Sequence, residues 1–389
     1  MRIVLTCNYS PWSAYSGGGQ HSTDQIATAL GGRGHRVSVV FTKPPWERIP
    51  VPDDLPYEII WAAFFGLKSN RRVYTRPLNA LSVMQAVKEI VRRNPGTVVH
   101  SQGEEGAAIP FLRKTGYDFS FVITPRFPRY PKALAEPESG RTRRFLSAVL
   151  EPKYHAMGMA VRGADRVCPT SNYSLKEVSR IFGIPSERCS VVHNGLDPVF
   201  FGVKRKPDAG NGPLVFFGRL AESKGTRELI QALALLGDSC PDVLIIGRGD
   251  DEGFIKSASR KHGLETRVRI KGWLSPDDLA GVLSEASIVV LPSHEESFGN
   301  AMAETLAAGA PLVSTTAGSI PEIVKSGEHG ILVPPGDGKA LASAIESLIA
   351  DPEKAENMGR AGRKHAARSF SWDRTASGYE KIYRELAER

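Results

Sequence analysis

Short apolar runs separated by helix-length segments recur along almost the whole chain of 389 residues. In the first half these runs lie at residues 3–5, 37–41, 98–100, 121–123, 166–169 and 191–193, and a helical pattern over about 20–30 follows the first. Parallel strands can be joined only by a long crossover, which is usually a helix. The alternation therefore predicts an α/β fold, a doubly wound parallel sheet with helices on both faces.

The same alternation restarts in the second half, after the polar segment 204–213. The new apolar runs lie at 214–217, 243–246, 268–270, 288–291, 312–314 and 331–333. A chain of this length exceeds what one core usually covers, so we predict two α/β domains with 204–213 as the linker. Two such domains in tandem imply a cleft, and the ligand loops are expected after the carboxyl ends of the strands.

Composition excludes several classes of protein. No apolar stretch reaches the roughly 18 residues that span a bilayer, and the start of the chain is too soon polar for a signal peptide, so we expect a cytoplasmic protein. The four cysteines, at 7, 168, 189 and 240, are scattered and have no Cys-x-x-Cys pair or histidine partner at metal spacing. They are expected to be reduced thiols in or near the core, with no metal site.

The formal charge of +8 is unevenly distributed. Residues 1–190 hold 26 Lys and Arg against 15 Asp and Glu, whereas residues 191–389 hold 24 against 27. The excess base gathers at 71–76, 126–132 and 141–144. An anionic acceptor, an anionic membrane surface or nucleic acid could each explain it, and basic residues that only keep the protein soluble explain it equally well.

The run 295–304 places two acids, Glu296 and Glu304, eight positions apart around a turn at 297–299. Small residues after Asn300, ended by a glycine and a proline, predict a helix whose first amides attract an electron-rich ligand. Acids about 12 Å apart along a helix are too distant for a hydrolase pair and suit separate parts of one elongated polar molecule. The alternative is a solvated helix start with acids that suit its dipole.

Two cations follow the first apolar run of the second half. Arg219 lies at the end of that run and Lys224 just before a helical pattern, and together they could grip a diphosphate, although the P-loop spacing is absent. The alternative is two surface cations beside a turn. Gly247 and Gly249 form a glycine turn after the next run, and Trp273 could lie against a base or belong to the core or rim.

Together these motifs resemble the retaining glycosyltransferases of family four, which have the GT-B fold. The likeness covers nearly the whole chain and rests on the order of Gly17-Gly18-Gly19, Asn194-Gly195-Leu196-Asp197, Gly218-Arg219, Lys224-Gly225, Gly247-Arg248-Gly249, the E-x7-E run, Ala307-Ala308-Gly309-Ala310-Pro311, and the ending through Trp372, Tyr379, Tyr383 and Leu386. The resemblance implies two Rossmann-like doubly wound parallel-sheet domains facing a central cleft. Residues 1–195 would bind the acceptor, 196–370 the nucleotide sugar, and 371–389 would form a helix crossing back onto the first domain.

The resemblance also implies roles for particular residues. Arg219 and Lys224 would hold the donor diphosphate, and Glu304 the ribose hydroxyls. Glu296 and the amides of the helix start would hold the transferred sugar. The residues expected to bind the donor are Gly18, Gly19, Arg219, Lys224, Gly247, Gly249, Trp273, Glu296, Phe298, Gly299, Asn300 and Glu304. Transfer would be retaining, on the face from which the leaving group departs, and would need no metal or other cofactor besides the nucleotide sugar.

One position departs from the family pattern. Many members have a histidine after the strand that here ends at Ile123, and this chain has Arg126 there. Arginine cannot shuttle a proton near neutral pH but can neutralise a phosphate or an acidic sugar. Either the histidine is dispensable here, or Arg126 contacts an anionic group, or activity is reduced. Arg126 is counted with Glu296, Arg219 and Lys224 as catalytic. His100, Glu104, Arg126 and Arg129 are the candidates for acceptor contact, and Glu105 lies beside Glu104 on the same glycine-flanked loop. The alternatives are a structural role for His100 and a solvated loop for the two acids.

The sequence therefore predicts a nucleotide-sugar-dependent retaining glycosyltransferase. The family's usage favours a UDP-sugar over a GDP-sugar, and the basic half favours an anionic or lipid-phosphate-linked acceptor, with peripheral membrane contact as a further candidate. Two other classes stay open: a sugar-nucleotide epimerase of similar fold, and a catalytically degenerate binding protein for an anionic partner. Nucleic acid is the least favoured partner, because isolated aromatics among arginines more often mark a packed loop.

Overall fold

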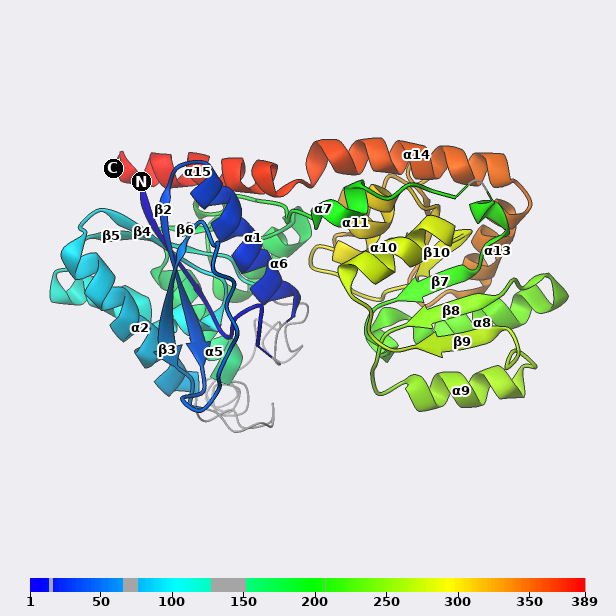
Figure 1. The fold of residues 1–389 in the computed structure, drawn as a ribbon, viewed down its shortest axis with the longest axis horizontal. Helices are drawn as coiled ribbons and strands as arrows, with labels where there is room; N and C mark the ends of the chain where they lie inside the picture. The colour runs from blue at the N-terminus through cyan, green and yellow to red at the C-terminus, as the bar shows by residue number, and fades with distance from the viewer. Residues whose placement is uncertain (14–16, 66–75, 127–151, 207, 389) are drawn as a thin grey trace. The chain divides into compact units, whose positions relative to one another are not determined.

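The computed structural model describes residues 1–13, 17–65, 76–126, 152–206 and 208–388 (Figure 1). Contacts divide the chain into two units, one of Met1–Gly195 with Trp372–Arg389 and the other of Leu196–Ser371. Within the described ranges, no helix combines the length and the apolar character that a bilayer span requires. In the part of the chain that the structure describes, each unit contains one parallel sheet, and the sequence-based prediction of two doubly wound α/β domains is confirmed.

The first unit is built on six parallel strands. They are β1 (Arg2–Cys7), β2 (Arg36–Lys43), β3 (Glu58–Ala63), β4 (Thr97–Ser101), β5 (Phe119–Ile123) and β6 (Arg166–Val167). Their order is β3-β2-β1-β4-β5-β6, and every neighbouring pair is parallel. The chain moves one way from β1 and the other way from β4, so the order of the sheet reverses between these two strands.

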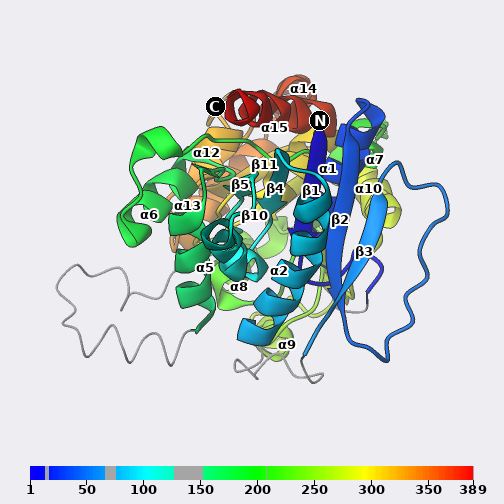
Figure 2. The ribbon, with the colours of Figure 1, turned by 90° about the vertical axis from the view of Figure 1, so that its left-hand side faces the viewer.

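Alternate residues of the strands face opposite sides of this sheet, as the period of two in a strand requires. On one side, Ile3 and Leu5 pack with α1 (Gly18–Gly32) and α15 (Trp372–Ala387), which contact each other. On the other side, Val4 packs with α2 (Arg76–Arg93), the 3₁₀ segment η2 (Glu104–Thr115) and α5 (Pro152–Gly163). Figure 2 looks onto this unit, with α2 in front and α15 along the top. The short α6 (Asn172–Phe182) and η3 (Ser186–Arg188) follow β6.

The second unit repeats this plan. Its strands are β7 (Leu214–Phe217), β8 (Val243–Ile246), β9 (Val268–Lys271), β10 (Ile288–Leu291), β11 (Leu312–Thr315) and β12 (Ile331–Val333), in the order β12-β11-β10-β7-β8-β9. Its α-helices are α7 (Pro198–Phe201), α8 (Thr226–Leu236), α9 (Glu252–Lys261), α10 (Pro276–Glu285), α11 (Asn300–Ala308), α12 (Ile320–Ile323), α13 (Gly338–Ile349) and α14 (Pro352–Ser369). The 3₁₀ turns are η4 (Ala209–Asn211), η5 (Glu222–Lys224) and η6 (Gly237–Ser239).

One core joins both faces of the second sheet. Helix α8 packs with α9 and α13, whereas α11 packs with α7, α10 and α14 (Figure 1). The six strands predicted in this half are all present, and α11 begins at Asn300 as predicted. It ends before Gly309, whose backbone is left-handed with φ 74°. Cys7, Cys168, Cys189 and Cys240 are free thiols, and all but the half-buried Cys189 are buried.

Two sequence-based predictions about this fold are wrong. The run 191–193 forms no strand: the Val192 amide bonds to the Pro169 carbonyl, and the Thr375 hydroxyl of α15 donates to the His193 carbonyl. The segment 204–213 is not a linker between the units, since it lies wholly within the second. Arg205 there donates to the Leu283 and Ala286 carbonyls at 3.0 and 2.6 Å, which ties the segment to α10.

Candidate functional site

The strand order of the second unit reverses between β7 and β10, which are neighbours in the sheet. From β7 the chain proceeds to β8 and β9, and from β10 it proceeds to β11 and β12 in the opposite direction. Loops that leave the carboxyl ends of two such strands diverge and make room for a ligand. The loops here are 218–225 after β7 and 292–299 after β10, and they hold Arg219, Lys224 and Glu296.

Lys224 and Glu296 meet across these two loops. The Lys224 Nζ lies 2.5 Å from the Glu296 Oε1, and the Ser293 hydroxyl donates to the same oxygen at 2.9 Å. The side chains of Lys224 and Glu296 are 26% and 14% exposed, so both reach solvent while being held in place. A second contact joins the loops, since the His294 amide donates to the Ser223 carbonyl at 3.0 Å. The sequence predicted both charged residues but not their contact, and it missed Ser293.

Glycines fix the backbone around this ion pair. Gly225 has φ 72°, and a Cβ there would lie 2.0 Å from the Pro292 carbonyl oxygen of the neighbouring loop. Gly318, after β11, has φ 55°, and its Cβ would lie 2.3 Å from the Glu296 carbonyl oxygen. That same oxygen accepts hydrogen bonds from the Ser319 amide and hydroxyl, at 3.0 and 3.1 Å. The backbone of Glu296 is therefore closely surrounded, and both glycines occupy conformations that other residues adopt only under strain.

The turn before α11 presents backbone rather than side chains. Gly299 caps the helix with φ 93°. The Phe298 side chain is 3% exposed and packs edge-on against Phe370, with ring centroids 5.7 Å apart, so only its amide can serve a ligand. Asn300 is the first helical residue, and Glu304 lies on the second turn, half-buried. The N-terminus of α11 therefore lies next to Glu296 in the chain, as the sequence predicted.

The other predicted donor residues lie on neighbouring loops of the same sheet edge. Arg219 is exposed directly after β7. Gly247 and Gly249 follow β8 and pack on the first loop, since Cβ atoms there would lie 1.8 Å from the Gly218 oxygen and 2.1 Å from the Leu220 oxygen. Trp273 follows the edge strand β9 and is 73% exposed, which makes it a rim residue rather than a core one.

In the first unit, Gly18 and Gly19 form the first turn of α1, at the carboxyl end of β1. The Gln20 side chain accepts from the Gly17 amide at 3.0 Å and donates to the Asn8 carbonyl at 2.6 Å, which anchors this helix start. Arg126, after β5, lies beside it: a Cβ on Gly19 would be 3.6 Å from the Arg126 Cδ. Burial lowers the pKa of the Arg126 guanidinium from its ordinary value.

The remaining candidates for acceptor contact have different surroundings. His100 is fully buried, and both of its ring nitrogens have hydrogen-bond partners. These surroundings favour a structural role for His100 over acceptor contact. Glu104 is half-buried at the start of η2. Its neighbour Glu105, on the same glycine-flanked loop, is 3% exposed rather than solvated, and burial raises its pKa to about 8. Arg129, like the basic clusters 71–75 and 141–144, lies outside the described residues.

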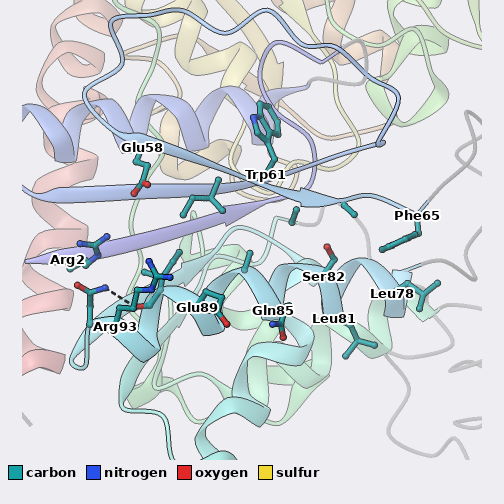
Figure 3. A pocket seen from close by; sticks show the side chains of 16 residues that line it. Arg2, Glu58, Trp61, Phe65, Leu78, Leu81, Ser82, Gln85, Glu89 and Arg93 are labelled. Carbon is teal, nitrogen blue, oxygen red and sulfur yellow. Dashed lines mark hydrogen bonds between the residues drawn. The ribbon is translucent and has the colours of Figure 1, made fainter.

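A separate hollow of about 760 Å³ lies between β3 and α2 (Figure 3). Charged residues line one end of it, among them Arg2, Glu58 and Arg93, and exposed apolar side chains line the other, namely Phe65, Leu78 and Leu81. Among the described residues that line this hollow, none is a predicted site residue. In the described ranges, no group of three or more His, Cys, Asp or Glu side chains could hold a metal ion.

Two family models match this chain in tandem. Residues 16–200 match the model described as Glycosyltransferase Family 4, and residues 204–365 match the model described as Glycosyl transferases group 1. With the two doubly wound sheets, these matches make the chain similar to the glycosyltransferases of the GT-B fold.

Relatives and solved structures agree with this class. The glycogen synthase of Mycobacterium tuberculosis (strain CDC 1551 / Oshkosh) is 32% identical over 63% of this chain, and the chain spans about 60% of that protein's length. The D-inositol 3-phosphate glycosyltransferase of Segniliparus rotundus is 27% identical over 98% of this chain and 88% of its own length. Sucrose-phosphate synthase from Thermosynechococcus elongatus has the same fold, with TM-score 0.81, 21% identity and 99% of both chains covered. Anabaena Alr3699/HepE, solved with UDP, has TM-score 0.72 and 19% identity, with both chains fully covered.

Proposed function

We propose that this chain is a retaining glycosyltransferase that moves a sugar from a nucleotide-diphosphate sugar to an acceptor hydroxyl. The observation that carries the proposal is the contact between Lys224 and Glu296 at the reversal point of the second sheet, directly before the N-terminus of α11. A cation, a carboxylate and the first amides of a helix at one place match the three parts of such a donor, because they suit phosphate, sugar hydroxyls and developing negative charge.

Each group has a distinct task in this proposal. Arg219 and Lys224 bind the diphosphate, and Glu304 accepts hydrogen bonds from the ribose hydroxyls. Glu296 and the amides of Phe298, Gly299 and Asn300 bind the hydroxyls of the transferred sugar. Before the donor arrives, Lys224 already holds the Glu296 carboxylate, so this acid is oriented without being left as an unpaired charge. Gly18 and Gly19 line the start of α1, the corresponding helix N-terminus of the first unit.

In the reaction, the bond between the anomeric carbon and the diphosphate oxygen breaks, and a bond to the acceptor oxygen forms on the same face. The acceptor's proton goes to the departing phosphate oxygen, so the transfer needs no oxidant, reductant or further co-reactant. Charge that builds on the diphosphate is stabilised by Arg219, Lys224 and helix N-termini, which act as fixed donors. We propose that these groups suffice without a metal ion.

The donor base is proposed to be uracil. Alr3699/HepE has been solved with UDP and with UDP-glucose, and both structures share the fold of this chain. For the acceptor we propose an anionic molecule bound by the first unit, because that half carries the excess of basic residues and Arg126 lies beside the N-terminus of α1. One relative that matches almost the whole chain is named D-inositol 3-phosphate glycosyltransferase, and D-inositol 3-phosphate carries an anionic phosphate.

Two substitutions test the donor site. Glu304→Gln is expected to weaken binding of the nucleotide sugar about tenfold, because a hydrogen bond to a charged group is lost.

Glu296→Ala is expected to lower turnover about 100-fold with a smaller effect on nucleotide binding. Transfer is followed by proton NMR of the anomeric centre in the product, which also reports retention. Parent-like transfer by both variants, or an inverted product, would contradict the proposal.

A further inference from the structure

Arg126 is held in place by two uncharged side chains. Its Nε and Nη2 donate to the Gln102 Oε1 at 3.0 and 2.8 Å, and its Nη1 donates to the Asn194 Oδ1 at 3.2 Å. Gln102 follows β4 and is 3% exposed, and Asn194 is 5% exposed. An arginine that only neutralised a surface anion would need no such support. Two adjacent donors of this guanidinium, Nε and Nη2, share one acceptor oxygen, and this fixes the orientation of the guanidinium plane.

The bonds to Arg126 determine which way the Gln102 amide points. Arginine has donors only, so the oxygen of the amide must face it, and the amide nitrogen must face the other side. On that side the Gln102 Nε2 lies 3.2 Å from the His100 Nε2. An amide nitrogen is a donor only, so this ring nitrogen of His100 has to accept and carries no proton. The Thr124 hydroxyl, 2.8 Å from the same nitrogen, then donates to it as well.

The tautomer of His100 follows from this. A neutral imidazole with an unprotonated Nε2 carries its proton on Nδ1, and the His100 Nδ1 lies 2.5 Å from the Tyr383 hydroxyl. His100 and Tyr383 are both fully buried, and burial lowers the pKa of His100 to about 3, which keeps the ring neutral across the physiological range. A chain of hydrogen bonds therefore runs from α15 through His100 and Gln102 to Arg126.

We infer that Gln102 is a positioning residue for Arg126, and that His100 together with Tyr383 of the C-terminal helix fixes the amide of Gln102 in the required orientation. The inference rests on the proposed function only in assigning Arg126 a role in transfer. The geometry of the chain stands without it. If Tyr383 loses its hydroxyl, His100 can move its proton to Nε2, and the Gln102 amide then turns its nitrogen toward Arg126, which leaves two sets of donors facing each other.

The first test reads the guanidinium directly by NMR. The Arg126 Nε–H signal is assigned as the one absent from Arg126→Lys. In Gln102→Leu this signal is expected to shift and to exchange faster with water, and in Gln102→Glu, which keeps an acceptor for the guanidinium, it is expected to stay slow. Tyr383→Phe is expected to perturb it as well. Its control is Tyr57→Phe, a buried tyrosine of the same core whose hydroxyl donates to Asp24 at 2.6 Å. An unchanged signal in Gln102→Leu would overturn the inference.

The second test is a double-mutant cycle on sugar transfer. Gln102→Leu is expected to lower kcat/KM about tenfold in the parent, the size of a lost buried hydrogen bond to a charge, and to have almost no effect in Arg126→Ala. An equal loss in both backgrounds would mean that Gln102 acts without Arg126, which contradicts the inference. If the parent transfers no sugar, the proposed function fails, and the NMR arm still decides the role of Gln102.

Discussion

Among single residues, Glu105 carries a carboxyl that is buried at the start of η2. It accepts hydrogen bonds from the Thr6 hydroxyl at 3.1 Å and from the Gln102 amide at 3.0 Å. Burial raises its pKa to about 8, and the neighbouring charge of Glu104 adds to the effect. The folded protein thus holds this proton between about pH 4.5 and 8, where the unfolded chain releases it. Its contribution to stability is greatest below this interval and declines as the pH rises through it.

Glu105→Gln removes this titration and keeps an oxygen to accept both hydrogen bonds. The variant is expected to be more stable than the parent at pH 9 by about 1–3 kcal/mol and to lose that advantage near pH 5, because only the parent has to ionise a buried acid. Thermal unfolding measured across this range checks the prediction. Glu89→Gln, on the exposed side of α2, is the control and should show the parent's pH dependence. Parallel curves for parent and Glu105→Gln would contradict the assignment.

Residue types alone indicated which groups bind the donor, because Arg219, Lys224, Glu296 and Glu304 all follow strand ends or begin a helix. They could not indicate which polar residues are internal supports. Gln102, Ser293 and Glu105 also lie after strands, and only the packed structure shows that Gln102 and Ser293 hold a charged neighbour. His100 differs because its partner Tyr383 lies 283 positions away, a contact that no local pattern reveals.

At the scale of elements, the loop that carries Glu296 depends on one glycine. Gly318 and Gly327 both have positive φ, at 55° and 83°, but only a Cβ on Gly318 would meet a neighbour, the Glu296 carbonyl oxygen. Gly318→Ala is therefore expected to destabilise the protein by about 2–4 kcal/mol, against about 1 kcal/mol for the control Gly327→Ala.

The same pair of variants also tests the site. Moving the Glu296 backbone is expected to lower turnover about tenfold in Gly318→Ala, with a smaller effect on UDP binding, and to leave turnover unchanged in Gly327→Ala. Sugar transfer at a temperature where both variants are folded measures this difference. Equal turnover by the two variants would show that the position of Glu296 does not depend on Gly318.

Most elements of both sheets could be predicted from alternation, because each apolar run followed by a helical segment became a strand. The exceptions have local causes. Strand β3 was not predicted, since residues 44–57 join it to β2 without a helix. The apolar run 191–193 looked like a strand, but its apolar side chain Val192 packs on α15 beside Gly378 instead. Apolar runs show that a segment is buried, and only the tertiary contacts show against what.

At the scale of the whole chain, the last helix belongs to the unit that contains the first strand. Tyr379 and Tyr383 of α15 are buried in the core of the first unit. Glu380 of the same helix forms ion pairs with Arg33 at the end of α1 and with Arg384. These partners, Arg33 first, lower the pKa of Glu380 to about 2. The ion pairs therefore contribute stability above about pH 4.5, and that contribution is lost as the pH falls toward 2.

Glu380→Gln is expected to lower the Tm at pH 7 by about 2–4 °C, the change that ~1 kcal/mol makes in a domain of this size. The difference from the parent should shrink as the pH is lowered from about 4.5, because the parent then loses the same charge. Glu385→Gln, whose side chain is 45% exposed, is the matched control on the same helix and should unfold like the parent. A Tm difference that is constant from pH 7 to pH 3 would contradict this account.

The proposed function requires the second unit to hold a uridine nucleotide through its own side chains and helix amides. The most direct measurement is a calorimetric titration of the whole chain with UDP, GDP and ADP in the presence of EDTA. The account predicts that UDP binds selectively without metal, and that Lys224→Met weakens its binding about tenfold while Lys261→Met, on the exposed end of α9, does not. Absence of binding by all three nucleotides, or UDP binding that appears only with a divalent cation, would contradict it.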